Sequence, residues 1–159
     1  MPTRYERNYT KIEKLFQRTL ADLEVGDHFK LYAQGFMPLT VEVLPDCHET
    51  GGKLVSMCHY FTQNGDLCQD PEVVVRLFPP GLTVFLHLCP STDASLGRAE
   101  AVEFQQALPP VYQRVYPQPG QYLPKLRDSL NSFLGDWLNN MKEQGHKPRD
   151  PESEENQAD

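Results

Sequence analysis

The chain has 159 residues, 39% of them hydrophobic, and a formal net charge of −7. This length suits one domain with its own core, and the composition is too apolar and too aromatic for a wholly disordered chain. The longest nearly apolar stretch, residues 82–89, is too short to span a bilayer, and the charged first residues lack the apolar run of a secretory signal. We therefore expect a cytoplasmic protein that does not enter a membrane.

The first predicted element is a helix with one apolar and one basic face. Thr10 and Glu13 have the spacing of a capping box, Asn8 is an alternative cap, and Gly26 provides a stop. Apolar residues recur every three or four positions, namely Ile12, Leu15, Phe16, Leu20 and Leu23. The opposite side carries four bases that we call the basic stripe: Arg7, Lys11, Lys14 and Arg18.

The middle of the chain predicts antiparallel strands, because short runs rich in β-branched and aromatic residues alternate with turn residues. The predicted strands cover residues 28–33, 39–44, 54–61, 73–78 and 82–89. Asn64-Gly65 is typical of a hairpin turn, and Pro79-Pro80-Gly81 predicts a second hairpin between the last two strands. Residues 101–108 are a weaker sixth strand, for which a short helix stays an open alternative.

The last predicted element is a second amphipathic helix. Pro124 suits its first turn and Gly145 follows its last apolar position. Its apolar stripe consists of Leu126, Leu130, Phe133, Leu134, Trp137, Leu138 and Met141. A run of strands between two helices predicts an α+β fold with a single antiparallel sheet of about five or six strands, packed against the N-terminal and C-terminal helices. We expect residues 1–147 to form one globular domain.

Residues 148–159 differ from the rest of the chain in charge. They contain five acidic residues and one arginine, so their net charge is −4, and they have no apolar periodicity. Such a segment cannot offset the entropy cost of ordering, so we expect a disordered acidic tail. The tail either only aids solubility or docks a basic partner.

The cysteines and histidines do not predict a metal site. Two Cys-His dipeptides, Cys47-His48 and Cys58-His59, are accompanied by Cys68, His87 and Cys89. Neighbours in a strand point to opposite faces, and no Cys-x₂₋₄-Cys knuckle is present. We therefore expect free thiols, no metal and no cofactor. The chain also lacks a nucleophile elbow, a phosphate-binding glycine loop and a zinc-binding helix, so no catalytic residue is assigned.

Residues 59–72 form the most distinctive polar stretch. One interpretation is a strand that leads into an Asn-Gly turn and an Asp-Pro turn, with carboxylates bound to backbone amides. The other is a polar recognition site where these side chains converge at one sheet edge with an arginine. The candidate binding residues are His59, Asn64, Asp66, Asp70, Glu72 and Arg76.

Several stretches in order resemble a known family. They are Arg4-Tyr5, residues 39–44, residues 74–78, Tyr116-Pro117-Gln118 and residues 133–138, and together they resemble the YqiB-like family of uncharacterised bacterial proteins. Residues 59–72 also resemble a motif of a second uncharacterised bacterial family, associated with plasmids and other mobile elements. These resemblances imply a bacterial, cytoplasmic, single-domain protein and carry no activity with them.

These observations favour a non-enzymatic domain that binds another macromolecule, most simply a protein, in an interaction or regulatory role. An alternative is a small enzyme or ligand-binding domain that uses the 59–72 segment. A third is nucleic-acid binding through the basic stripe, which the net acidic charge of the chain makes less favourable. The sequence leaves the oligomeric state open.

Overall fold

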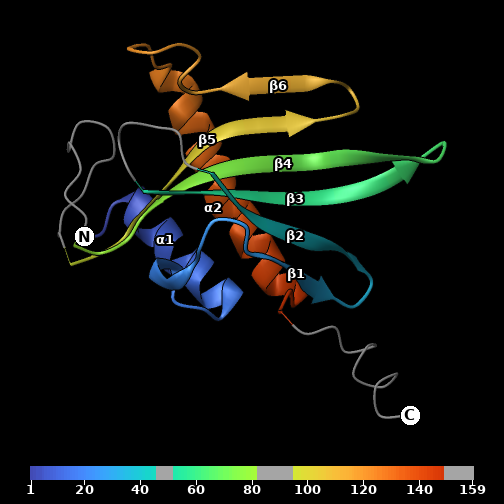
Figure 1. Ribbon diagram of the computed structural model, residues 1–159, viewed down its shortest axis with the longest axis horizontal. Coiled ribbons are helices and arrows are strands. Elements are labelled where there is room, and N and C mark those ends of the chain that lie inside the picture. The colour runs from blue at the N-terminus through green and yellow to red at the C-terminus, as the bar shows by residue number, and fades with distance from the viewer. Residues whose placement is uncertain (46–51, 82–94, 149–159) are drawn as a thin grey trace.

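A computed structural model describes residues 1–45, 52–81 and 95–148. Six strands form one antiparallel sheet in chain order, α2 crosses behind it and α1 lies beside α2 (Figure 1). The elements are α1 (Arg4–Phe16), the 3-10 helix η1 (Leu20–Asp22), β1 (His28–Ala33), β2 (Phe36–Leu44), β3 (Lys53–Gln63), β4 (Asp66–Phe78), β5 (Arg98–Gln106), β6 (Val111–Arg114) and α2 (Pro124–Gln144). The predicted α+β fold, one antiparallel sheet between an N-terminal and a C-terminal helix, is confirmed.

Helix α1 begins earlier than the sequence predicts. Its capping box is formed by Thr3 and Glu6: the Thr3 hydroxyl accepts from the Glu6 amide, and the Glu6 carboxylate accepts from the Thr3 amide. The predicted caps Asn8 and Thr10 therefore lie inside the helix. Glu13 does not cap the start of the helix. Its carboxylate accepts a hydrogen bond from the backbone amide of Leu20, after the end of α1, at 3.1 Å.

The first helix also ends earlier than predicted. Gln17 adopts a left-handed conformation with φ 54°, which ends α1 after Phe16, and the chain then forms η1. The predicted apolar face is nevertheless buried throughout, because Leu20 and Leu23 reach the same core from outside the helix. The hydrophobic pattern thus identified the buried side chains correctly and the helix length wrongly.

The strands agree with the prediction in position more than in length. β1 matches its predicted range, β2, β3 and β4 are longer, and residues 101–108 are largely strand, which resolves the open alternative in favour of β5. β6 was not predicted, since its four residues lie between two proline-containing segments and show little alternation. Pro79-Pro80-Gly81 follow the end of β4, with Pro80 and Gly81 in a turn, and the strand predicted at 82–89 lies outside the described residues.

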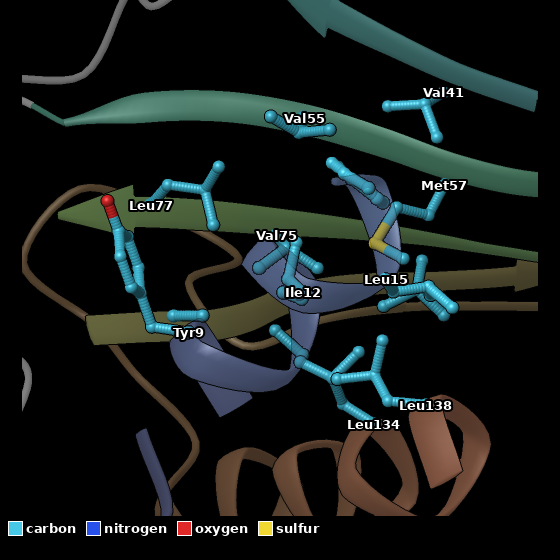
Figure 2. Packing of buried hydrophobic residues seen from close by; sticks show 14 of the residues in the cluster. Tyr9, Ile12, Leu15, Val41, Val55, Met57, Val75, Leu77, Leu134 and Leu138 are labelled. Atoms are coloured by element: carbon cyan, nitrogen blue, oxygen red, sulfur yellow. The ribbon is translucent and has the colours of Figure 1, made fainter. Parts of the chain in front are cut away.

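The hydrophobic core occupies one face of the sheet. Phe29, Val41, Met57, Val73 and Phe104 are consecutive cross-strand partners from β1 to β5 and belong to the core or pack against it. Figure 2 shows strand side chains meeting α1 and α2 side chains in this core. We call this side of the sheet the inner face and the opposite side the outer face. Because side chains alternate along a strand, every second residue lies on the outer face.

Helix α2 is fixed to β5 as well as to the core. Asn131, which is fully buried, accepts from the Ala101 amide at 2.7 Å and donates to the Ala101 carbonyl at 3.2 Å. This side chain therefore replaces a neighbouring strand at a point on β5 that β6 does not reach. Where the two helices meet, the side-chain amide of Asn8 donates a hydrogen bond to the backbone carbonyl of Asn131 at 3.2 Å.

The chain after α2 returns to the first edge of the sheet. Gly145, in a left-handed conformation with φ 91°, ends α2 as the sequence predicts. Lys147 then forms an antiparallel bridge with Tyr32 of β1 through two backbone hydrogen bonds. The predicted acidic tail, apart from Pro148, lies outside the described residues.

Candidate functional site

Much of the 59–72 stretch serves as strand and turn. Asn64 and Gly65, with φ 53° and 84°, form the two-residue turn between β3 and β4, and Gln63 pairs with Asp66 across it. Both turn residues need positive φ, which Asn and Gly adopt most readily, so this turn follows directly from the sequence. Asp66 is exposed beside the turn, and Asp70 is exposed immediately before Pro71.

The structure does not bring the six candidate binding residues to one point. His59 lies on the inner face beside Leu39, whereas Glu72 and Arg76 lie on the outer face. Glu72 and Arg76 are four residues apart on one strand, which separates them by about 13 Å. Asn64 and Asp66 lie farther away, at the tip of the hairpin.

His59 belongs to a buried aromatic cluster. Its side chain is 8% exposed, its Nδ1 donates to the Pro38 carbonyl at 3.0 Å, and its ring meets Trp137 edge-on at 5.4 Å between centroids. Burial lowers the pKa of His59 and the nearby His146 lowers it further, while the hydrogen bond to the Pro38 carbonyl and the charge of Asp70 act in the opposite direction. A neutral imidazole with this burial has a packing role in the structure.

His146 joins this cluster from the segment after α2. Its ring centroid lies 5.7 Å from that of His59, and its Nε2 donates to the Met37 carbonyl at 2.9 Å. Its Nδ1 lies 3.3 Å from the Met141 carbonyl. The two histidines thus connect β2, β3 and the end of α2. Sequence reasoning did not select His146, because nothing in its local pattern indicates contact with a strand 109 residues away.

The outer face carries mostly polar side chains, and among the described helices a side chain of α2, Arg127, reaches it at the end where Arg76 and Glu100 lie. Two cross-strand rows run over all six strands from β1 to β6. The first row contains Lys30, Thr40, Cys58, Glu72, Gln105 and Tyr112. The second contains His28, Glu42, Ser56, Val74, Glu103 and Arg114.

Two tyrosines and three glutamates form a group on this face, which we call the Tyr–Glu surface: Tyr60, Tyr112, Glu42, Glu72 and Glu103. Burial raises the pKa of Tyr60 to about 12, with smaller contributions from Cys58, Glu72 and Glu42. Burial also raises the pKa of Tyr112, with further contributions from Glu103, to which it is hydrogen-bonded, and from Glu72. Glu72 therefore lies within electrostatic reach of both phenols.

Cys58 lies beneath the Tyr–Glu surface. It is 1% exposed, and burial raises its pKa to about 12. Since the thiolate is the reactive form, this thiol is unreactive near neutral pH. Cys68 is half-buried, and both cysteines are free.

A buried ionic cluster lies farther along the outer face. Glu100 is 2% exposed, its Oε1 is 2.9 Å from the Arg127 Nε, and it accepts a hydrogen bond from the Tyr116 hydroxyl at 2.5 Å. Burial raises the pKa of Glu100, while the Tyr116 hydrogen bond and the charges of Arg127 and Arg76 act in the opposite direction. The Arg127 guanidinium also lies over the Tyr5 ring at 4.9 Å. The predicted site residue Arg76 thus belongs to a structural cluster with Glu100.

The basic stripe is less regular than a single helix face. Arg7 and Lys14 are exposed on α1, and the Arg7 guanidinium donates to the Pro2 carbonyl at 2.7 Å. Lys11 is half-buried, and Arg18 follows the end of the helix and lies over the Phe29 ring at 4.5 Å. Near the start of α1, Arg4 and Arg7 line an open depression together with Tyr5, Asp128 and Ser129.

The described part of the chain has neither a metal-binding cluster nor a membrane-spanning helix. Residues 1–45, 52–81 and 95–148 contain no group of three His, Cys, Asp or Glu side chains that could hold a metal ion. Cys47, His48, His87 and Cys89 lie outside these ranges. No described helix combines the length and the apolar character needed to cross a membrane.

Comparison with known proteins identifies one family. A family model described as "Domain of unknown function (DUF6908)" matches residues 7–147. No curated protein and no solved structure matches the chain significantly. The resemblances to the YqiB-like and mobile-element families, and with them the bacterial and cytoplasmic setting, stay predictions.

Proposed function

The chain belongs to the DUF6908 family, whose description assigns no activity, and we propose from its geometry that it is a protein-binding domain that uses the outer face of its sheet. The observation that carries this proposal is the Tyr–Glu surface. It presents two phenols and three carboxylates on the outer face, away from the end where Arg127 contacts Glu100, while both helices pack against the core on the inner face.

Exposure and composition support contact with a protein. Tyr112 is 57% exposed and Glu42 is also exposed, so these groups are accessible at the surface. Tyrosine contributes a large apolar area and a hydrogen-bonding group with little conformational entropy to lose, which is why it is enriched at binding hot spots. The strands beneath hold these side chains in a fixed register, so the surface is organised before a partner binds.

The two alternative functions have less support from the geometry. A small enzyme or ligand-binding site at residues 59–72 needs His59 and the carboxylates together. Asp70 lies within electrostatic reach of His59, but Glu72 is on the outer face and Asp66 is beside the turn. Nucleic-acid binding through the basic stripe would depend mainly on Arg7 and Lys14, which are exposed. Lys11 is half-buried, and Arg18 lies on the Phe29 ring.

Photocrosslinking in cells of the native host tests the proposal. We would replace Tyr112, on the outer face, by p-benzoylphenylalanine, and make the same replacement at Lys14 on the basic stripe and at Glu143 on α2. Position 112 should crosslink to a discrete protein, since an aromatic side chain at this exposed position would lie within the interface. Mass spectrometry of the crosslinked band identifies the partner and the contacting peptide.

The two control positions decide between the candidate functions. Crosslinks to a protein from position 112 and not from positions 14 and 143 support the proposal. Crosslinks to nucleic acid from position 14 assign function to the basic stripe instead. If position 112 gives no protein crosslink in cells where the protein is expressed at its native level, the outer face is not the binding surface.

A further inference from the structure

We propose that the partner docks on the Tyr–Glu surface through a cationic segment, an exposed run of protein chain with several Arg or Lys side chains. This inference rests on the proposed function and specifies the chemistry of the partner. It follows from the arrangement of charge on the outer face, from the shortage of cations that neutralise that charge, and from the position of the tyrosines.

The three carboxylates lie on the central strands of the sheet. Glu42 belongs to β2, Glu72 to β4 and Glu103 to β5. Adjacent strands are about 4.8 Å apart, so the strand of Glu42 lies about 10 Å from that of Glu72, and Glu103 is one strand farther. Side chains at i and i+7 of a helix are about 10 Å apart and those at i and i+4 of a strand about 14 Å apart. A segment of either form can therefore place two cationic side chains over carboxylates of different strands.

The structure neutralises this charge only in part. Glu103 has an ion pair with Arg114, at 3.6 Å between Nε and Oε1. Glu72 accepts a hydrogen bond from the neutral Gln69 amide at 3.3 Å. Within the described ranges, neither Glu42 nor Glu72 has an ion pair with a basic side chain. Lys30 and Arg114 lie on the edge strands, and Arg76, on the central strand β4, acts on Glu100 about 13 Å along the strand from Glu72. The part of the face around Glu42 and Glu72 therefore retains negative charge.

The tyrosines add a second means of recognising cations. The electron-rich face of a phenol ring attracts guanidinium and ammonium groups, and a carboxylate beside the ring strengthens this attraction. Tyr60 is within electrostatic reach of Glu42 and Glu72, and Tyr112 of Glu72 and Glu103. Each phenol is thus accompanied by two carboxylates. A phosphate backbone would meet the same carboxylates with repulsion, which argues against nucleic acid on this face.

Binding of a defined cationic peptide to the full-length protein tests this inference. The probe is fluorescein-labelled octa-arginine, with labelled octa-glutamate as the opposite-charge control, followed by fluorescence anisotropy at fixed ionic strength. The test variant combines Glu42→Gln, Glu72→Gln and Glu103→Gln. The matched variant combines Glu24→Gln, Asp136→Asn and Glu143→Gln, which removes the same charge from exposed positions elsewhere.

The two triple variants have equal net charge, so a difference in their affinity for octa-arginine shows that the position of the carboxylates matters. We expect the outer-face variant to bind octa-arginine about tenfold more weakly than the wild-type chain, and the matched variant to change affinity less than about twofold. Equal losses in the two variants, or octa-arginine binding no tighter than octa-glutamate, would overturn the inference.

The crosslinked peptide separates this inference from the proposed function. A partner captured at position 112 through a segment rich in Arg or Lys supports both. Capture through a neutral or acidic segment keeps the protein-binding function and overturns the cationic partner. Absence of any protein crosslink at position 112 overturns the proposed function itself.

Discussion

At the scale of single residues, the least expected feature is a carboxylate buried in the sheet. Glu100 is accommodated because Arg127 supplies a charge at 2.9 Å and Tyr116 a hydrogen bond at 2.5 Å. A buried ion pair often adds little net stability over apolar residues of the same shape, but removal of one partner leaves the other charge buried. Glu100 is therefore a position where the cost of substitution is high.

We predict that Glu100→Ala lowers the free energy of unfolding by about 3 kcal/mol, because Arg127 and Tyr116 lose their shared acceptor inside the protein. Glu103→Ala serves as the control, since its ion pair with Arg114 is partly exposed and should be worth less than about 1 kcal/mol. Urea denaturation followed by tryptophan fluorescence at Trp137 measures both. Similar values for the two variants would show that the buried cluster does not stabilise the fold.

At the scale of elements, contacts between distant segments decide where helices begin and how they dock. Thr3 caps α1 in place of Thr10, and both residues have an acidic residue three positions later, so the local pattern fits either start. The earlier start lets Tyr5, Asn8 and Tyr9 become buried. Asn8 then reaches α2, where a Cβ at Gly135 would lie 3.2 Å from the Asn8 Oδ1. Packing of one helix on the other therefore favours the earlier start of α1.

We predict that Asn131→Ala lowers the free energy of unfolding by about 3 kcal/mol, because it leaves the buried amide and carbonyl of Ala101 without their partner. The exposed Asn139→Ala, on the same helix, should change the free energy of unfolding by less than about 0.7 kcal/mol, in the stabilising direction, because Ala favours a helix more than Asn does. Hydrogen exchange gives a second measurement, since the Ala101 amide should exchange faster in Asn131→Ala alone. Unchanged protection at Ala101 would mean that α2 does not anchor β5 through this side chain.

At the scale of the whole molecule, two segments far apart in the sequence meet at a pair of buried histidines. His59 comes from the centre of the sheet and His146 from beyond the last helix, and each donates to a carbonyl of β2. Burial lowers the pKa of His59, so the folded state favours its neutral form. The stability that follows is present above the ordinary pKa of 6.5 and is lost as the pH falls through the lower pKa of the folded state.

We therefore predict that the free energy of unfolding falls as the pH is lowered from about 8 to about 5, and that His59→Gln makes this fall shallower. The comparison uses the slope with pH, because the substitution also changes packing against Trp137. His28→Gln, at an exposed position, is the control and should keep the wild-type slope. An unchanged slope in His59→Gln would exclude this histidine as a source of acid sensitivity.

The sequence by itself determined the arrangement of a run of strands between two helices, the buried faces of those helices and the turn at Asn64-Gly65, but not β6. These features depend on hydrophobic periodicity and on the backbone preferences of single residues, which are local properties. For the same reason, Ile12, Leu15 and the apolar residues of α2 were correctly expected in the core.

Only the tertiary structure decided which polar residues meet. Six side chains close in sequence at 59–76 are distributed over two faces and a hairpin tip, because strand alternation and a two-residue turn carry neighbours apart. Tyr60, Tyr112 and the three glutamates of the Tyr–Glu surface come from five strands and span 71 positions of sequence, and cross-strand register brings them together. Register depends on contacts between distant segments, so no local sequence pattern predicts such a surface.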